Sequence, residues 1–397
     1  MRRNSLLVFL CVPAVCFGQA PPASPMIRAS LQKYVDSGDI SGAVAVVGQA
    51  DRLVACEAIG QADLAAKTPM AADALFRIAS MTKPITAIGI MMLADEGRLN
   101  VNDKVEKYLP EFKNQMLVAK RDFDTLVLKK PARPIAIKDL LTHTSGLPGG
   151  YPAGLSDLYT KRNRTLAEAA LVMSQRPLEF EPGSKWAYCN TGMDTLGRII
   201  EVVSGKSYEQ FLQVRLFDRL GMNDTTFYPS AEQLKRVATL YRKPQNGPLK
   251  PAANPLIKLT KGAKFPIPAG GLFSTGSNLA TLYSMMLHRG AWQGKRLLSE
   301  AAVAEMTKVQ TDDLPNVGFV PGSAWGLGWS IVKEPQGVTA MLSPGTFGHG
   351  GAFGTQAWID PAQNLFVVLL IQRTGLANSD ASPMRQSLQE AAVRAIK

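Results

Sequence analysis

Ser80-Met81-Thr82-Lys83 stands where the apolar run 74–79 gives way to a helical pattern. Pro84 suits the first turn of this predicted helix, and Gly97 suits its end. Between them, apolar or small residues recur at the spacing of one helical face: Ile85, Ile88, Gly89 and Met92. Ser80 and Lys83 are three residues apart, so they lie one turn from each other on the same face. An amine within reach of a hydroxyl is the minimum that serine nucleophilic catalysis needs without histidine.

Two other serine–lysine pairs have the same spacing but a different context. Ser30 and Lys33 belong to an amphipathic helical pattern, which makes Ser30 a surface residue. Ser330 and Lys333 belong to a strand-like run, in which residues three apart project to opposite faces. Ser80 alone opens a helix, so it is the candidate nucleophile.

The N-terminus is typical of a secretory signal peptide. Arg2 and Arg3 precede the apolar run 6–17, and small residues follow at Gly18 and Ala20. We therefore expect residues 1–20 to direct export to the periplasm or the medium; an uncleaved anchor is the alternative. No later run is long and apolar enough to span a membrane.

The composition indicates a soluble globular protein: of 397 residues, 46% are hydrophobic and 19% charged. The formal net charge of +12 could attract wall polymers, anionic lipid or nucleic acid, but the charges are scattered and no nucleic-acid motif accompanies them. A solvated basic surface is the favoured interpretation.

Cys56 and Cys189 are expected to be buried free thiols, although export would permit a disulfide. No cluster has metal-ligand spacing, so neither a metal nor another cofactor is predicted.

The order of predicted elements indicates an α+β fold. Helix 25–37 and strands 42–49 and 52–59 open the chain, and strands 326–332, 354–359 and 365–372 and helix 382–396 close it. The middle is mostly helical: 137–141, 166–174, 191–204, 208–216 and 277–288. We expect one antiparallel sheet built from the N- and C-terminal strands and flanked by the terminal helices. This α/β lobe would comprise about 25–80 and 300–397, and a helical lobe about 81–299 would face it across a cleft.

Two later segments offer partners for Ser80. The first holds Tyr188-Cys189-Asn190, where the phenol could exchange a proton with the serine and the amide could bind substrate. Such a tyrosine needs a lowered pKa, which an adjacent ammonium would supply. The alternative is a core tyrosine beside a turn amide.

The second segment is Gly348-His349-Gly350-Gly351-Ala352. Glycines beside a strand let the backbone approach a ligand, and the Ala352 N–H could join that of Ser80 in an oxyanion hole. The alternative is a glycine-rich bulge with a surface histidine. His143 is interpreted as structural. With no Gly-x-Ser-x-Gly elbow and three histidines in the chain, a Ser-His-Asp triad is poorly supported and Lys83 is the better base.

In this order, Ser80-x-x-Lys83, Tyr188-x-Asn190 and His349-Gly350-Gly351 resemble the motifs of class C β-lactamases and penicillin-binding-protein-like serine hydrolases. Further stretches are similar to that family: 137–147, Leu220-Gly221-Met222, 268–275 and Trp358-Ile359-Asp360-Pro361. The resemblance covers about residues 25–395. It implies a β-lactamase/transpeptidase-like fold, acylation of Ser80, and proton transfer shared by Lys83 and Tyr188. It also implies substrate contact at Asn190 and the third segment (His349, Gly351, Ala352).

The third segment departs from the family pattern. Enzymes that bind a substrate carboxylate carry Lys-Thr-Gly there, whereas this chain has His349-Gly350-Gly351. The β-lactamase-like carboxylesterases commonly lack that lysine, and segment 113–134 resembles an insertion of theirs. That segment is expected to be an inert surface hairpin; a flap over the cleft is the alternative.

The main hypothesis is a secreted serine hydrolase acting on esters. The alternatives are a β-lactamase or D-amino-acid-specific peptidase, an acyltransferase, and a penicillin-binding sensor without turnover. The small-molecule substrate could thus be an ester, an amide or a β-lactam.

Overall fold

Eight antiparallel strands from the two ends of the chain form the central sheet, as the sequence predicted. The computed structural model describes residues 23–397 except 156–157, 246 and 254–261. The spatial order is β12-β13-β14-β15-β16-β1-β2-β3. The bounds are β12 Ser323–Trp325, β13 Ser330–Val332, β14 Thr346–Gly350, β15 Gln356–Asp360, β16 Leu365–Leu370, β1 Gly42–Gln49, β2 Arg52–Asp63 and β3 Thr68–Pro69. The α+β fold class is therefore confirmed.

The first and last parts of the sequence meet at the centre of this sheet. β1 lies between β2 and β16, with Val46 opposite both Cys56 and Val368. All of β16, and β1 up to Gly48, is buried, which explains the unbroken apolar runs of these two strands. Both ends of the chain are thus required to complete one core.

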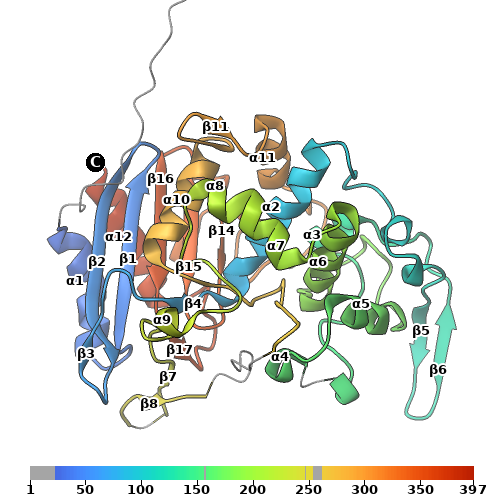
Figure 1. Cartoon of the computed structure of the whole chain (residues 1–397), viewed down its shortest axis with the longest axis horizontal. Coiled ribbons are helices and arrows are strands. Elements are labelled where there is room, and N and C mark those ends of the chain that lie inside the picture. Colours follow the sequence, from blue (N-terminus) through green and yellow to red (C-terminus); the bar gives the residue numbers. More distant parts are fainter. Residues whose placement is uncertain (1–22, 156–157, 246, 254–261) are drawn as a thin grey trace, which may run out of the picture.

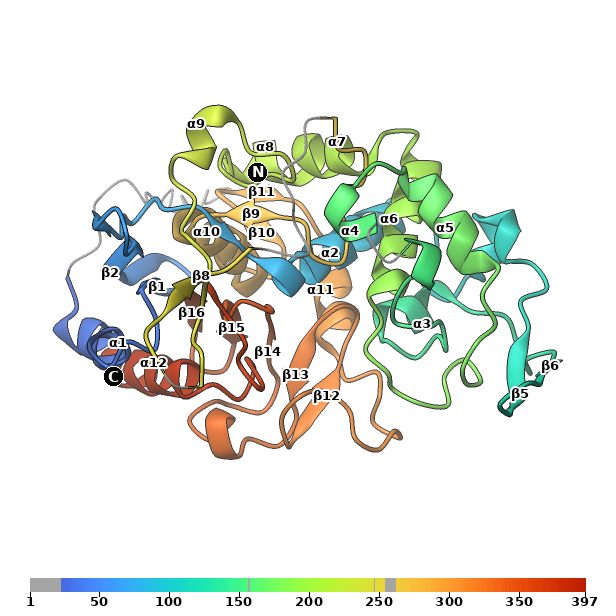
Figure 2. The ribbon, with the colours of Figure 1, turned by 90° about the horizontal axis from the view of Figure 1, so that it is seen from below.

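The terminal helices cover one face of the sheet. α1 (Pro25–Asp36) and α12 (Pro383–Ala395) pack against each other, on β2 and β16 respectively (Figures 1 and 2). Ser24 and Ser382 cap their N-termini, and a proline follows each cap. Helix α10 (Gly276–Leu287) covers the other face over β1 and β16, although the sequence placed it in the helical lobe.

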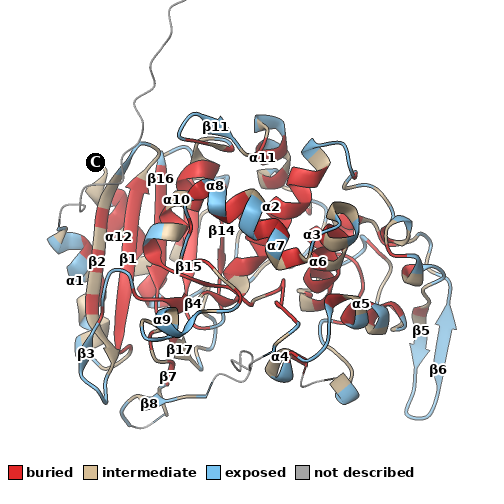
Figure 3. Ribbon diagram, in the orientation of Figure 1, coloured by how far each residue is buried: buried red, intermediate tan, exposed pale blue. Residues whose placement is uncertain are grey.

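Helix α2 (Thr82–Asp95) connects the sheet to the helical part. It contacts α6 (Asn190–Ser204) and β14, and nearly its whole length is buried (Figure 3). This central position explains why α2 is apolar around most of its circumference. The other helices are α3 Ile137–Leu141, α4 Leu158–Lys161, α5 Leu166–Ser174, α7 Tyr208–Leu212, α8 Asp218–Leu220, α9 Ala231–Leu234 and α11 Glu300–Thr307.

Two predicted elements differ from the structure. The run 326–332 is not one strand, because residues 326–329 form the turn between β12 and β13. Gly328 has φ +80° there, and a Cβ atom on it would lie 2.3 Å from the Ala87 Cβ atom of α2. The predicted helix 208–216 is α7 followed by a π-helical turn, Gln213–Phe217. Apolar spacing alone does not distinguish these two helix types.

Segment 113–134 forms the predicted surface hairpin. Its strands, β5 (Leu117–Arg121) and β6 (Leu126–Lys129), project from the end of the molecule that lies away from the sheet (Figure 1). The tip residue Phe123 is fully exposed, and most of both strands is exposed (Figure 3). A cavity of about 240 Å³ opens at the hairpin base near Phe112 and Pro134, and no predicted site residue lines it.

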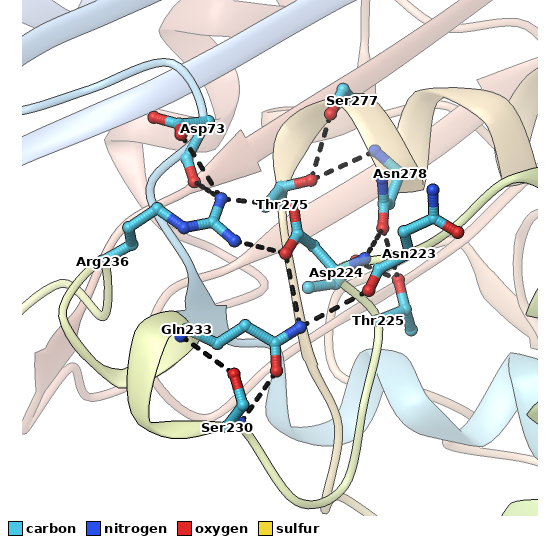
Figure 4. A network of polar contacts seen from close by, with 11 residues as sticks. Asp73, Asn223, Asp224, Thr225, Ser230, Gln233, Arg236, Thr275, Ser277 and Asn278 are labelled. Atoms are coloured by element: carbon cyan, nitrogen blue, oxygen red, sulfur yellow. Dashed lines mark hydrogen bonds and ion pairs between the residues drawn. The ribbon is translucent and has the colours of Figure 1, made fainter.

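A polar network supports the approach to Ser80. β4 (Phe76–Arg77) pairs with β9 (Phe273–Ser274), which leads into the N-terminus of α10. Arg236 forms ion pairs with Asp73 and Asp224, and the Asn278 side chain accepts hydrogen bonds from the Asp224 N–H and the Thr225 hydroxyl (Figure 4). The network joins α9, the loop before it and α10 to the segment that precedes β4.

The remaining short strands are β7 Tyr241–Arg242, β8 Lys250–Pro251, β17 Arg373–Thr374, β10 Ala291–Trp292 and β11 Lys295–Arg296.

Some predictions concern parts of the chain that the structure does not describe. The expected signal peptide, residues 1–20, lies outside the described residues. No helix in the described part has the length and apolarity needed to cross a bilayer.

Cys56 and Cys189 are both free thiols, but Cys56 is only half-buried because it lies on β2, which is partly covered.

Candidate active site

Ser80 lies in a 3₁₀ turn, Ala79–Met81, that runs directly into α2. The preceding residue, Ala79, has φ +47°, a left-handed conformation that is unusual for a residue with a side chain. Strained backbone of this kind persists where the surroundings fix it, and it recurs at functional sites. Here the turn leaves Ser80 at the surface of a pocket while Ala79 and Met81 are buried.

The Lys83 amine has no exposed surface and makes three hydrogen bonds. Its Nζ atom lies 3.2 Å from Ser80 Oγ, 2.7 Å from Asn190 Oδ1 and 2.7 Å from the Ala269 carbonyl oxygen. Carbonyl oxygens only accept, so the last two contacts fix two N–H groups of the amine. The third position of Nζ therefore faces the Ser80 hydroxyl, either as an N–H or as a lone pair.

Burial lowers the pKa of Lys83 from its ordinary value to about 7, because the ammonium loses its hydration. The negative charge of Asp194 acts in the opposite direction. A lysine with a pKa near 7 is unprotonated about half of the time at neutral pH, and the free amine can accept a proton from Ser80.

Tyr188 faces Ser80 from the other side of the site. Its ring centroid is 4.6 Å from Lys83 Nζ, and its side chain lines the same pocket as Ser80. The expected lowering of its pKa was wrong: burial raises the pKa of the Tyr188 phenol, and the Ser80 hydroxyl only partly opposes this. Lys83 releases its own proton near pH 7, below the pH at which a phenol ionises, so it supplies no charge to lower the pKa of Tyr188. Tyr188 is therefore protonated in this structure.

Asn190 begins α6 and points its amide oxygen at Lys83. The preceding residue, Cys189, caps the helix, because its sulfur accepts a hydrogen bond from the Gly192 N–H. This cap fixes the backbone at the start of α6 and so the directions of the Tyr188 and Asn190 side chains on either side of Cys189. The Tyr-x-Asn spacing thus brings a phenol and an amide to one pocket.

The third predicted segment contributes backbone to the site. Ala352 lines the pocket with Ser80, and its N–H donates no hydrogen bond within the described residues. Gly351 packs so closely that a Cβ atom would lie 2.5 Å from the Ile78 carbonyl oxygen. His349 is 2% exposed and does not line the pocket, and its Nδ1 atom lies 2.6 Å from the Gly350 carbonyl oxygen. The alternative of a surface histidine is therefore wrong, because β14 is buried on both faces.

His143 has the structural role that the sequence predicted. Its Nδ1 atom accepts a hydrogen bond of 3.1 Å from the Cys189 N–H, and its ring packs 4.6 Å from the Tyr188 ring. Trp325, Trp186 and Phe319 complete an aromatic wall around Tyr188. The sequence analysis missed this wall, because its members come from three segments with no shared motif.

The pocket itself has a volume of about 190 Å³ and a mostly apolar lining. Ser80, Asn190 and Ala352 contribute polar groups to the lining, and Ile267, Phe353 and the ring of Tyr159 contribute apolar surface. None of the described residues that line it is charged, and no three described His, Cys, Asp or Glu side chains come together as metal ligands. The pocket thus suits an uncharged group next to Ser80.

The residues at the site that were not predicted include Tyr159, Ala269 and Asp194. Tyr159 carried no motif at all. Ala269 lies in a stretch used only for the family resemblance. Asp194 lies four residues after Asn190 on a helix, which places both on one face and could have indicated it.

Residues 27–391 match the Beta-lactamase protein family. The chain belongs to this family. The match covers the three motif segments, both halves of the sheet and the helices between them, so it includes every predicted site residue.

Relatives of this Beta-lactamase family member include an esterase. Protein Rv1367c of Mycobacterium tuberculosis is 34% identical over 89% of this chain and 91% of its own length. Esterase EstB of Burkholderia gladioli is 28% identical over 83% of this chain and 85% of its own. The solved structure of EstCE1, a hydrolase with promiscuous acyltransferase activity, matches with a TM-score of 0.76 and 24% identity over 93% of this chain and 97% of its own. The protein is a serine hydrolase of the β-lactamase fold.

Proposed function

We propose that this enzyme hydrolyses carboxylic esters through an acyl-enzyme at Ser80. The observation that carries the proposal is the hydrogen bond between Lys83 and Ser80 at an apolar pocket in which none of the described lining residues is charged. A base within reach of the nucleophile gives the chemistry, and the uncharged lining favours a neutral substrate.

Acylation begins with the neutral form of Lys83. Its lone pair takes the Ser80 proton as Oγ attacks the ester carbonyl, and the carbonyl oxygen becomes an oxyanion. The Ser80 and Ala352 N–H groups stabilise that charge. When the C–O bond breaks, the protonated Tyr188 gives its proton to the departing alkoxide and recovers one from the Lys83 ammonium. Water then attacks the acyl-enzyme by the reverse proton path and releases the acid.

The third segment argues against substrates that carry a carboxylate. Burial lowers the pKa of His349 to about 3, so this residue is neutral at physiological pH and supplies no cation. A carboxylate lies beside it: a Cβ atom on Gly350 would be 2.4 Å from Asp380 Oδ1. Neither His349 nor Asp380 lines the pocket, so this segment offers no cation to a substrate carboxylate.

The pocket volume suggests a short acyl group. A pocket of about 190 Å³ with Tyr159, Ile267 and Phe353 in its lining suits an acyl chain of a few carbons. Each methylene that it buries adds about 0.8 kcal/mol to binding. The preferred laboratory substrates are therefore small acyl esters.

The test is the rate at which p-nitrophenyl butyrate is hydrolysed by the wild type and by Ser80→Ala. We expect loss of turnover in the variant and a butyryl adduct on Ser80 in the intact mass of the wild type. Equal rates for the two proteins would rule the proposal out. Ser30→Ala is the matched control, because Ser30 has the same serine–lysine spacing but lies on α1 and donates to the Ile27 carbonyl oxygen.

The second candidate is a β-lactamase or a D-amino-acid-specific peptidase. Asn190 favours it, because the amide lies at the pocket and could bind a substrate amide. Nitrocefin hydrolysis much faster than ester hydrolysis would establish this candidate instead. Stable labelling of Ser80 by penicillin without product release would indicate a sensor.

Export by residues 1–20 is part of the same proposal. The basic start, the apolar run and the small residues after it support a cleaved signal peptide. Fractionation of an expressing bacterium should place the shortened chain outside the cytoplasm, and full-length chain in the cytoplasm would contradict export.

A further inference from the structure

A buried carboxylate that the proposed mechanism does not use lies beside the site. Asp194 on α6 is 2% exposed. Its Oδ2 atom accepts hydrogen bonds from the hydroxyls of Tyr159 (2.6 Å) and Tyr151 (3.0 Å). Its Oδ1 atom accepts one from the Ala269 N–H (3.1 Å). A buried charge is costly unless it is satisfied in this way, so its retention beside a site requires an explanation.

Ala269 joins this carboxylate to the base. Its N–H donates to Asp194, while its carbonyl oxygen accepts the 2.7 Å hydrogen bond from Lys83 Nζ. Asp194 therefore holds Ala269 in place. The Ala269 carbonyl in turn fixes one of the two N–H groups that orient the Lys83 amine. Asn190, on the same face of α6 one turn earlier, fixes the other.

The turn around Ala269 needs such an anchor. Ile267 has φ +61°, which is a genuine outlier for a β-branched residue. The next carbonyl, that of Pro268, accepts a hydrogen bond of 2.8 Å from the Thr86 hydroxyl of α2. A strained turn held from both α2 and α6 places the Ala269 carbonyl against Lys83.

We propose that Asp194 is a positioning residue for Lys83, acting through Ala269, and that Tyr159 extends this network to the pocket wall. Tyr159 donates to Asp194 and also lines the pocket beside Ser80. Contact between a substrate and Tyr159 is thus transmitted to the carboxylate that orients the base. This inference rests on the proposed role of Lys83 as the base for Ser80.

Charge makes this role testable. The Asp194 carboxylate favours the ammonium form of Lys83 and so opposes the lowering of the pKa of Lys83 by burial. Burial raises the pKa of Asp194 itself to about 6, while its hydrogen-bond donors act to lower it. Asp194 is therefore mostly ionised at pH 7, and removing its charge should make Lys83 easier to deprotonate.

The other titratable groups around the pair keep one charge state between pH 6 and 8. Burial lowers the pKa values of His143 and His349, which face Lys83, so both rings are neutral. Burial raises the pKa values of the neighbouring hydroxyl and thiol groups, so they stay protonated: Tyr151, Tyr159, Tyr188, Tyr208 and Cys189. A pH profile in this range thus reports on Lys83 and Asp194.

The experiment compares wild type and Asp194→Asn by the rate at which a fluorophosphonate probe labels Ser80, measured by intact mass from pH 5 to 9. We expect the midpoint of the acid limb to fall by about one pH unit in the variant. An unchanged midpoint would overturn the proposal, even if the variant has a lower melting temperature, because a carboxylate that is not coupled to Lys83 would affect stability alone.

Tyr159→Phe keeps the experiment decisive if Asp194→Asn does not fold. It removes one donor from Asp194, which raises the pKa of the carboxyl and leaves it less ionised at pH 7. The midpoint should again fall, by a smaller amount, and no fall would overturn the proposal. Probe labelling needs no natural substrate, so a wild type that is labelled but hydrolyses no ester would refute the proposed function while leaving this test intact.

Discussion

At the scale of the residue, Lys83 determines how the activity should depend on pH. Its pKa of about 7 means that the amine is mostly protonated at pH 6 and mostly free at pH 8. We expect kcat/KM for p-nitrophenyl butyrate to rise about tenfold per pH unit below pH 7 and to level off above it. Lys83→Arg should lose roughly 10³-fold, because a guanidinium has no lone pair to offer at these pH values. A flat profile between pH 5 and 9 would exclude Lys83 as the base.

The same residue affects folding. In the unfolded chain Lys83 keeps its proton up to its ordinary pKa near 10.5, whereas the folded state releases it near 7. The unfolded state therefore binds more protons between these values, so the contribution of Lys83 to the free energy of unfolding increases as pH rises from about 7 to about 10. The increase is on the order of 3–5 kcal/mol.

Lys83→Met removes the amine, so the variant should be inactive. It also lacks the pH-dependent contribution of Lys83, so its stability relative to wild type should be greatest at or below pH 7 and should decline toward pH 10. Urea unfolding of both proteins at pH 6, 8 and 10 measures the difference. A difference that does not vary with pH would show that Lys83 keeps its proton in the folded state.

At the scale of the element, the turn 267–271 is the part of the site with the least room for change. A Cβ atom on Gly271 would lie 1.8 Å from the Pro266 carbonyl oxygen. We expect Gly271→Ala to destabilise the fold by roughly 1–3 kcal/mol and to lower kcat by displacing the Ala269 carbonyl from Lys83. Gly154→Ala is the matched control, because a Cβ atom there would meet no atom within 4 Å. Equal melting temperatures and rates for both variants would contradict this assignment.

The hairpin β5–β6 should be dispensable for turnover. It is exposed, and no residue of the pocket comes from it. Replacing residues 119–127 by an Asn-Gly turn would leave Val118 and Leu128, which already face each other, as the last pair. KM for p-nitrophenyl butyrate should stay within about twofold of wild type. A large rise in KM would instead support a flap that closes over the substrate.

At the scale of the whole molecule, both chain ends are needed for one core. α12 buries Leu388 and Ala392 against α1 and the sheet, and Ile27 and Leu31 of α1 complete the same cluster. A chain ending at Ser382 should expose this face and aggregate, whereas a chain beginning at residue 23 should keep the melting temperature of the mature protein. Circular dichroism during heating distinguishes the two. A stable chain without α12 would mean that the sheet needs cover from α1 alone.

Much of the fold could be read from local patterns. The strands predicted at 42–49 and 365–372 and the helices predicted at 166–174 and 277–288 were recognisable because burial imposes a fixed spacing on each element. The turn at 326–329 was missed because its cause is a close contact with Ala87, far away in the sequence. The π-helical turn at 213–217 was missed because it keeps the spacing of an α-helix closely enough to look like one.

The sequence by itself determined the candidate nucleophile, since Ser80 and Lys83 meet within one helical turn whatever surrounds them. It also determined which residues could join them, because Tyr188 and Asn190 bracket a helix cap. Only the tertiary structure decided the protonation states: burial, which no local pattern encodes, makes Lys83 a neutral base near pH 7 and keeps Tyr188 protonated. It alone brought Ala269 to the amine of Lys83 and Asp194 to Ala269, because those contacts join residues 186 and 75 positions apart in the chain.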